Sequence, residues 1–296
     1  MNINISLGTP DISRRKAAST QPGPLCDKLS FAAAEAYKLL RTNLQFVLPE
    51  DKSCKVIGIT SPLRNEGKST TSVNLSYTIA QSGKRVLLID GDMRLPTIHQ
   101  KLSMQGSPGL SNLLAGLNEE REVLQVSKYY RNWYIMAAGD IPPNPSELLG
   151  SEKMQAALEH LSGYFDFIVV DLPPVNIVSD ALVASRWTDG LIVAARQNVT
   201  TGHSLQDCMY QIEAVHANFL GYVMTGVAVG EGAYKRYSKY GKYGKGKYAR
   251  YGYGYSYGNY GGYGNNSYGG NGKKKVDKET SAKFYEAITT QEQQDK

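Results

Sequence analysis

Short apolar runs alternate with helix-length segments through the middle of the chain, from residue 28 to residue 229. Most of these runs are continuously apolar, which is the pattern of strands buried on both faces. The predicted strands span residues 54–61, 84–92, 132–139, 165–171, 189–196 and 219–227, and the main helix-length segments between them span residues 67–82, 151–163 and 200–217. This order predicts an α/β fold, a mostly parallel central sheet flanked by helices, with its active site at the carboxyl ends of the strands.

A further helix is predicted for residues 31–47, ahead of the first of these strands. Its apolar side chains recur at helical spacing on one face: Tyr37, Leu40, Leu44 and Val47. Glu35, Lys38 and Arg41 recur every third residue beside that face. On pattern alone, such a charged row is typical of the solvated edge of a surface helix.

Composition divides the chain into three regions. Residues 1–27 are polar and are predicted to be a flexible N-terminal segment. Residues 28–229 form the predicted domain, and residues 230–296 are predicted to be a disordered, basic tail rich in tyrosine and glycine. The net charge of the whole chain is +6, but residues 230–275 hold ten lysines and arginines against one acid. Residues 230–275 of the tail therefore carry a charge of +9, and the rest of the chain is slightly acidic.

Several classes of protein are disfavoured by the composition. No apolar run approaches the ~20 residues that span a bilayer, and the N-terminus lacks the apolar stretch of a signal peptide. Cys26, Cys54 and Cys208 are odd in number and form no CxxC pair, so we expect neither a disulfide framework nor a zinc or iron–sulfur site. We therefore expect a cytoplasmic protein.

The stretch SPLRNEGKSTT, directly after the first predicted strand of the sheet, predicts a phosphate-binding loop. Backbone N–H groups of this turn and of the helix that follows would face a polyphosphate, with Lys68 neutralising its oxygens and the Ser69 hydroxyl binding Mg²⁺. Gly67 allows the backbone to approach the phosphates closely. Pro62 stands where the strict pattern G-x-x-x-x-G-K-[ST] has its first glycine, so the prediction depends on the strand before the motif and the helix after it.

Acidic residues end two other predicted strands. LLIDGDMR places Asp90 and Asp92 after one buried strand, and FIVVDLPP places Asp171 at the end of another. Carboxylates at this edge of the sheet can hold a hydrated Mg²⁺ beside a nucleotide, and one of them can accept a proton from an attacking hydroxyl. The plain alternative is that each carboxylate only caps the following helix, which is a strained account of three such sites in one sheet.

Together, TSPLRNEGKST, LLIDGDMR and FIVVDLPP resemble the motifs of the bacterial tyrosine kinases (BY-kinases) of capsular and exopolysaccharide synthesis, of the CpsD/CapB type. That family is similar in fold to the MinD- and ParA-like P-loop ATPases. EAYKLLRTNL, GLSNLLAG and AAGDIPPNPSELLGS are similar to further stretches of the same family. The resemblance covers roughly residues 28–229, and the tail matches the family's phosphorylated tyrosine cluster.

The resemblance implies a P-loop NTPase fold that binds ATP and Mg²⁺. Where the family's loop reads P-G-E-G-K-S, this chain has Arg64 and Asn65 in place of the first two residues, and asparagine is the non-glycine residue most at ease at positive φ. The implied nucleotide-binding residues are Asn65, Glu66, Gly67, Lys68, Ser69 and Thr70. The implied catalytic residues are Lys68, Asp90, Asp92 and Asp171, with Asp90 as the base for the tyrosine hydroxyl and Ser69, Asp92 and Asp171 as the magnesium site.

The resemblance also implies partners. Glu35, Lys38 and Arg41 fall on the family's E-x-x-R-x-x-R motif, which is associated with ring-like homo-oligomers. We expect the basic tail to enter the acidic, nucleotide-loaded mouth of a neighbouring subunit and to be phosphorylated there, besides other protein tyrosine substrates. The predicted phosphoacceptors are Tyr240, Tyr243, Tyr248, Tyr251, Tyr253, Tyr255, Tyr257, Tyr260, Tyr263 and Tyr268. The family further implies recruitment to the inner face of the cell membrane by a membrane-embedded activator (a polysaccharide co-polymerase), and a tyrosine phosphatase that reverses the reaction.

Two other readings remain open at this stage. A MinD/ParA-type positioning ATPase would share the loop and the acids, but it gives no reason for the tyrosines. A protein whose basic Tyr/Gly tail binds nucleic acid or condenses through stacking and cation–π contacts is compatible with composition, although no specific nucleic-acid partner is expected under the kinase reading. An Mrp-like iron–sulfur carrier is disfavoured because CxxC is absent.

Overall fold

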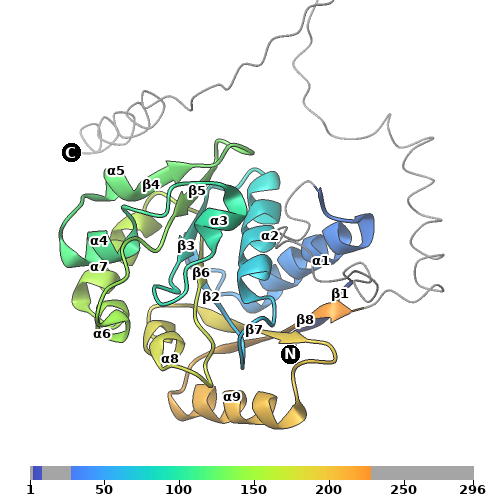
Figure 1. Ribbon diagram of the computed structural model, residues 1–296. Helices are drawn as coiled ribbons and strands as arrows, with labels where there is room; N and C mark the ends of the chain where they lie inside the picture. Colours follow the sequence, from blue (N-terminus) through green and yellow to red (C-terminus); the bar gives the residue numbers. More distant parts are fainter. Residues whose placement is uncertain (1–2, 9–27, 228–296) are drawn as a thin grey trace, which may run out of the picture. The chain divides into compact units, whose positions relative to one another are not determined.

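In the computed structural model, residues 3–8 and 28–227 of the 296-residue chain are described. The chain divides into two units, residues 1–229 and 230–296, and the described residues all belong to the first. Within these ranges the backbone forms a single eight-stranded sheet with helices on both of its faces (Figure 1). The predicted α/β class, with a mostly parallel central sheet, is confirmed.

The sheet has the strand order β1-β8-β7-β2-β6-β3-β5-β4. All neighbouring pairs are parallel except β5 and β4, which are antiparallel. The strands are β1 (Ile3–Gly8), β2 (Lys55–Thr60), β3 (Val86–Asp90), β4 (Leu124–Val126), β5 (Trp133–Met136), β6 (Phe167–Asp171), β7 (Gly190–Arg196) and β8 (Phe219–Val227). Six of them coincide with the six strands predicted from the apolar runs.

The two edge strands were not predicted. β1 lies within the N-terminal segment that was expected to be flexible, and its backbone instead pairs in parallel with β8, with Ile3 opposite Gly221. β4 is only three residues long, and it pairs with β5. Neither segment contains a continuous apolar run, because an edge strand is hydrogen-bonded on one side only and is less deeply buried than a central one.

Helices cover the sheet because each crossover between parallel strands must pass over one of its faces. The helices are α1 (Phe31–Val47), α2 (Lys68–Gln81), α3 (Ile98–Leu102), α4 (Leu110–Ala115), α5 (Glu120–Val123), α6 (Pro145–Leu149), α7 (Glu152–Ser162), α8 (Asp180–Ser185) and α9 (Gly202–Ala214). The four predicted helices correspond to α1, α2, α7 and α9. No described helix is both long enough and apolar enough to cross a membrane.

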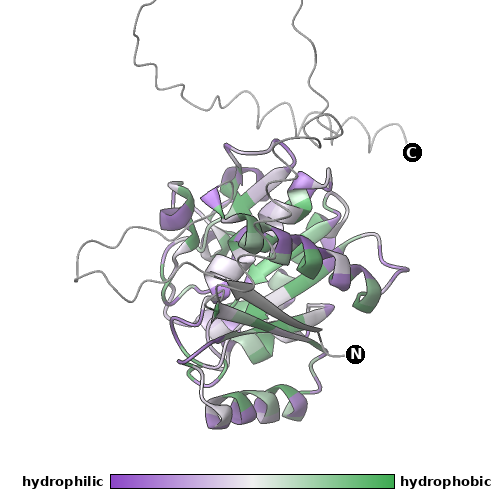
Figure 2. Ribbon diagram, turned by 90° about the vertical axis from the view of Figure 1, so that its right-hand side faces the viewer, coloured by the Kyte–Doolittle hydropathy of each residue, from purple (hydrophilic) through white to green (hydrophobic). Residues whose placement is uncertain are grey.

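The core lies between the sheet and the α1–α2 layer. Alternate strand residues such as Ile57, Val169 and Ile192 are buried there with Leu40 and Leu44 of α1. Hydrophobic residues accordingly gather on the central strands, and hydrophilic ones on the loops and the outer sides of helices (Figure 2). Both faces of the sheet are buried, which explains why the strands are apolar throughout.

Candidate functional site

A pocket of about 380 Å³ opens at the carboxyl ends of four neighbouring strands, β7, β2, β6 and β3. The strands end at Arg196, Thr60, Asp171 and Asp90, and the ladder places Asp90 directly beside Asp171. Parallel strands bring all their carboxyl ends to one edge, so residues far apart in the sequence meet here. The volume falls within the range typical of small-molecule sites.

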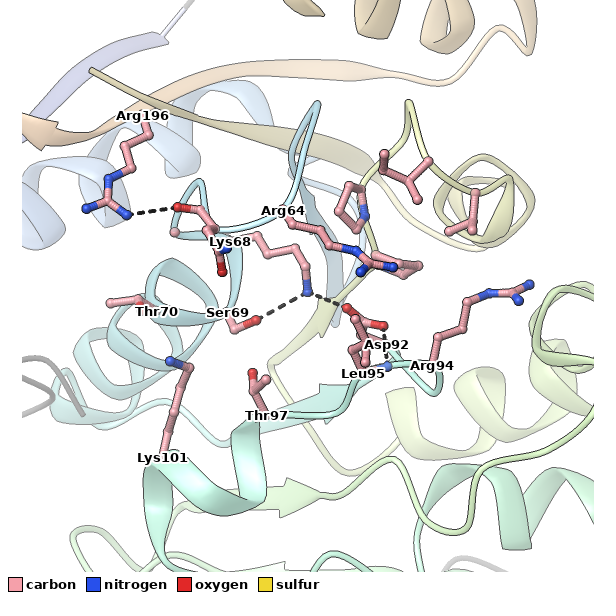
Figure 3. A pocket seen from close by; sticks show the side chains of 16 residues that line it. Arg64, Lys68, Ser69, Thr70, Asp92, Arg94, Leu95, Thr97, Lys101 and Arg196 are labelled. Atoms are coloured by element: carbon pink, nitrogen blue, oxygen red, sulfur yellow. Dashed lines mark hydrogen bonds and ion pairs between the residues drawn. The ribbon is translucent and has the colours of Figure 1, made fainter. Parts of the chain in front are cut away.

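The phosphate loop forms one wall of the pocket (Figure 3). Asn65 has φ +64° and Gly67 has φ +94°, so the loop makes two left-handed turns immediately before α2 begins at Lys68. The expectation that Asn65 replaces a glycine at positive φ is confirmed. Arg196 braces the loop from β7, since its Nη1 donates to the Asn65 carbonyl oxygen at 3.0 Å.

Glu66 does not line the pocket, although the family motif assigned it to the nucleotide. Its side chain is buried and turns away, accepting hydrogen bonds from the Leu63 N–H at 2.7 Å and from the Thr200 hydroxyl. Burial raises the pKa of this carboxyl, which those two hydrogen bonds oppose. Glu66 therefore fixes the curvature of the loop from behind, while Asn65, Gly67, Lys68, Ser69 and Thr70 line the pocket.

Lys68 lies at the centre of the site. Its Nζ is 2.7 Å from Asp92 Oδ2, 3.5 Å from Asp171 Oδ2 and 3.2 Å from Ser69 Oγ. Burial acts to lower the pKa of this lysine, but the charges of Asp171 and Asp92 outweigh it and the pKa is raised. The ammonium is therefore held charged at the base of the pocket, where it can neutralise an anion.

Asp90 and Asp171 lie in the layer beneath the pocket. Both are fully buried, and neither is among the residues that line the cavity. Burial raises the pKa of Asp171, with Lys68 opposing the shift, and burial together with the charge of Asp171 raises the pKa of Asp90 to about 7. Asp171 is held in place by Ser72, whose Oγ donates to its Oδ1 at 3.0 Å.

The environment of Asp90 does not suit the predicted role of base, because its carboxylate does not line the pocket and accepts backbone hydrogen bonds. Its Oδ2 accepts the backbone N–H groups of Thr97 at 3.1 Å and Ile98 at 3.0 Å, and its Oδ1 accepts the N–H of Asp92 at 3.3 Å. Both oxygens are thus used to hold the loop between β3 and α3. Asp92 is the carboxylate that lines the pocket in the described part of the chain.

The oxygen atoms around Lys68 suit a magnesium ion. The ammonium already bridges Ser69 Oγ and Asp92 Oδ2, which shows that a cation fits between these two oxygens. In the described ranges no three His, Cys, Asp or Glu side chains form a cage of their own. Mg²⁺ typically takes only one or two protein oxygens and completes its shell with water and substrate phosphates, so the donors present fit this ion.

The pocket is basic, which corrects the expectation of an acidic mouth. Among its lining residues in the described part of the chain, one is acidic, Asp92, and five are basic: Arg64, Lys68, Arg94, Lys101 and Arg196. The predicted acids are present, but two of them lie beneath the surface of the cavity. Such a lining favours a polyanion, and it disfavours a basic segment until an anion is bound.

Arg94 was quoted in the sequence motif but received no role. Its Nε and Nη2 form two hydrogen bonds to the carboxylate of Asp180, at 2.9 and 3.0 Å, and Ser146 contacts the same carboxylate. Asp180 is fully buried. We call these three residues the Arg94 clamp. It ties the loop after β3 to α6 and α8, and no sequence pattern places these distant segments together.

Other predicted residues lie elsewhere. Glu35, Lys38 and Arg41 are on α1, where Lys38 pairs with Glu35 at 2.8 Å and Arg41 donates to the Thr78 carbonyl oxygen of α2 at 2.8 Å. They contact their own chain and do not line the pocket. The predicted phosphoacceptor tyrosines, Tyr240 to Tyr268, lie outside the described residues.

Comparison with known proteins shows what the chain is similar to. The family model described as "AAA domain" matches residues 54–221. The tyrosine-protein kinase YwqD of Bacillus subtilis is 32% identical over 73% of this chain and 87% of its own length, and the putative tyrosine-protein kinase CapB of Staphylococcus aureus is 36% identical over 62% and 81%. Among solved structures, the kinase domain of the Escherichia coli tyrosine kinase ETK superposes with a TM-score of 0.68 at 31% identity, covering 76% of this chain and 89% of that one.

Proposed function

Because this chain belongs to the bacterial tyrosine-protein kinases, we propose that it transfers the γ-phosphoryl group of ATP to tyrosine side chains, including those of its own tail in a neighbouring copy. The observation that carries the proposal is that Lys68, Ser69 and Asp92 line one basic pocket, of which the phosphate-binding loop forms a wall. The Tyr/Gly-rich tail supplies acceptors in the same chain.

The residues have separate tasks in this reaction. The loop N–H groups and Lys68 bind the phosphate oxygens and stabilise the charge that develops on the leaving diphosphate. Ser69 and Asp92 would hold Mg²⁺, with Asp171 behind them, and the bound ion would neutralise negative charge on the phosphates. Arg196 and Glu66 keep the loop in shape.

The transfer breaks the bond between the γ-phosphorus and the oxygen that it shares with the β-phosphate, and it forms a bond from phosphorus to the phenolic oxygen. A tyrosine hydroxyl has a pKa near ~10, so its proton must be accepted as the new bond forms. We assign this role to Asp92, because it lines the pocket whereas Asp90 lies beneath it; both oxygens of Asp92 also accept hydrogen bonds, from Lys68 and from the Leu95 N–H. The products are ADP and phosphotyrosine.

The wider role follows from the family. We propose that the chain regulates capsular or exopolysaccharide synthesis and export from the inner face of the cell membrane. A membrane-embedded activator would recruit it there, a phosphatase would reverse its reaction, and unmodified copies would associate into a ring. The exposed apolar side chains of α1 support association, since hydrophobic patches on a surface mark contact sites.

The decisive experiment incubates the purified full chain with Mg-ATP, alone and with the cytoplasmic segment of a candidate activator, and detects phosphotyrosine by mass spectrometry. Lys68→Met should abolish the label, whereas Lys84→Met, an exposed lysine just ahead of β3, should retain it. A tagged Lys68→Met chain mixed with the unmutated one should become labelled, because transfer occurs between copies. ATP hydrolysis without any phosphotyrosine in either arm would instead support the positioning-ATPase reading.

A further inference from the structure

Two polar side chains of the pocket have no part in the chemistry described so far. Thr97 immediately precedes α3, and Lys101 lies one helical turn further, so that its N–H donates to the Thr97 carbonyl oxygen at 3.1 Å. Both line the cavity. Their spacing of four residues places the two side chains on the same side of the helix.

Thr97 has an unused hydroxyl. Its Oγ1 is buried and has no hydrogen-bond partner among the described residues. The backbone N–H of Thr97 donates to Asp90, so the end of the helix is already satisfied without this hydroxyl. A buried hydroxyl without a partner destabilises a fold, and it points to a ligand that supplies the missing atom.

Lys101 has an unused charge. Its ammonium forms no ion pair or hydrogen bond within the described part of the chain, although the side chain is only partly exposed. Burial lowers the pKa of Lys101, and the charge of Lys68 lowers it further, while Asp171 and Asp90 oppose the shift. An anion beside the Lys101 ammonium would supply the ion pair that the described residues do not provide.

The two side chains point toward the place where the phosphates of a nucleotide would bind. They rise from α3 toward the first turn of α2, the Thr97 hydroxyl toward Ser69 and the Lys101 side chain toward Thr70 (Figure 3). Ser69 and Thr70 begin the helix whose N-terminus receives the phosphates of a nucleotide. The same volume is thus bounded by the loop and α2 on one side and by these two groups on the other.

We propose that Thr97 and Lys101 form a second phosphate-binding element, which holds the phosphate chain of the nucleotide from the α3 side of the pocket. It rests on the proposed function only in so far as the pocket binds a nucleotide. The hydroxyl donates to a phosphate oxygen and the ammonium neutralises another. Because Asp90 holds the N-terminal end of α3, the element is attached to the same carboxylate layer that supports Lys68.

The test is nucleotide affinity, measured by calorimetry on the full chain with Mg²⁺ for ATP, ADP, AMP and adenosine. Lys101→Met should weaken ATP binding by about tenfold or more, since it removes a charge-assisted hydrogen bond. Thr97→Val should weaken it by about threefold to tenfold. Neither variant should change adenosine binding. Comparing the loss of affinity for AMP, ADP and ATP identifies which phosphate each residue contacts.

Matched variants separate binding from a structural effect. Lys101→Arg and Thr97→Ser keep the charge and the hydroxyl and should retain most of the affinity, while Lys84→Met should bind ATP as the unmutated chain does. Thr97→Val should melt no lower than the unmutated chain, because the buried hydroxyl has no partner to lose. Unchanged ATP affinity in Lys101→Met, or an equal loss for adenosine and ATP, would overturn the inference. Failure of the kinase proposal would appear separately, as intact ATP binding without phosphotyrosine.

Discussion

Asp90 and Asp92 follow the same strand two residues apart, yet their surroundings give them different tasks. Asp90 accepts three backbone N–H groups and is fully buried, whereas Asp92 lines the pocket and pairs with Lys68. Asp90 therefore supports the architecture of the loop between β3 and α3. Asp92 is placed to act on what the pocket binds.

This difference predicts that two similar substitutions affect different properties, the first mainly stability and the second mainly activity. Asp90→Asn replaces one acceptor oxygen by an amide nitrogen that would face backbone donors, so we expect a loss of about 1–3 kcal/mol of unfolding free energy, offset in part because the neutral side chain removes the burial cost and the repulsion by Asp171 that raise the pKa of Asp90. Asp92→Asn leaves Lys68 facing Asp171 at 3.5 Å, so stability should change less, while phosphotyrosine formation should fall by about a hundredfold or more. Denaturant unfolding and initial rates measure the two effects. A stable but inactive Asp90→Asn would return the role of base to Asp90.

Gly67 can be tested against a glycine with the same backbone conformation. Gly67 and Gly83 have φ of +94° and +91°, so alanine at either position costs about 1–2 kcal/mol through the left-handed backbone. A Cβ on Gly67 would also meet Thr225 at 3.0 Å, whereas one on Gly83 would meet nothing within 4 Å. We expect Gly67→Ala to weaken ATP binding in calorimetry and Gly83→Ala to leave it unchanged. Equal affinity in the two variants would mean that the shape of the loop is not what binds the phosphates.

At the scale of elements, prediction from sequence succeeded where burial imposes a pattern. Central strands such as β2 and β6 are covered on both faces, and because both faces are buried their sequences are continuously apolar. α3 has five residues, too few to show a helical period, and it was not predicted. Since Thr97 immediately precedes α3 and Lys101 lies within it, part of the pocket was missed for the same reason. The loop and the acids were found because each directly follows a predictable strand.

The Arg94 clamp links elements that the chain order keeps apart. Arg94 is partly exposed, but Asp180 is fully buried. Arg94→Met removes the cation and, within the described part of the chain, leaves the buried carboxylate of Asp180 with only the hydroxyl of Ser146 as a hydrogen-bond donor. We expect a loss of about 1–3 kcal/mol of unfolding free energy, reduced by the solvent access of Arg94. Asp180→Asn should restore part of it in the double variant, with a coupling energy of about 0.5–3 kcal/mol. Additive losses in a denaturant-unfolding cycle would show that the two residues act independently.

α1 has a second apolar face, opposite the one that packs on α2. Ala33, Tyr37, Leu40 and Leu44 are buried, while Phe31, Leu39 and Phe46 remain exposed, Phe46 to 81%. At 100° per residue these exposed side chains, together with Glu35, project from the outer side of the helix.

We therefore expect Phe46→Glu to reduce the oligomeric mass of the full chain in light scattering, without lowering its melting temperature. Gln45→Glu adds the same charge to the neighbouring exposed position and should leave the mass unchanged. An unchanged mass in Phe46→Glu would remove this face of α1 from the interface.

At the scale of the whole molecule, charge decides how the tail can meet the pocket. The pocket lining in the described part of the chain has five basic residues and one acid, and residues 230–275 carry +9. On these charges we expect the two to repel each other until Mg-ATP brings its negative charge into the cavity. We therefore expect the nucleotide to bind first and the acceptor tyrosine second. If the tail is phosphorylated as proposed, each phosphate contributes about −1.5 to −2 charges, so extensive modification reverses the sign of the tail, and we expect it to loosen the proposed ring.

The tail itself is not uniform, and this leads to a prediction about order. Residues 234–250, the basic half, interleave five tyrosines with seven lysines and arginines, whereas residues 251–268, the neutral half, contain seven tyrosines and no charged side chain. Even with Mg-ATP bound, the exposed guanidinium of Arg64 would repel the lysines of the basic half more than the neutral half, whereas the guanidinium of Arg94 is paired with Asp180. Tyrosines of the neutral half should therefore be phosphorylated first.

Mass spectrometry of the full chain, quenched at successive times after addition of Mg-ATP, measures this order directly. At low salt we expect occupancy of Tyr251–Tyr268 to lead that of Tyr234–Tyr248 severalfold. Raising the ionic strength toward about 0.5 M should narrow the difference, because it shortens the Debye length to a few ångströms. Replacing Lys242, Lys245 and Lys247 by glutamine should speed modification of the basic half without altering the neutral half. If the basic half leads at every salt concentration, charge at the pocket does not select the acceptor, and the lysines instead attract the tail to the anionic, nucleotide-loaded site.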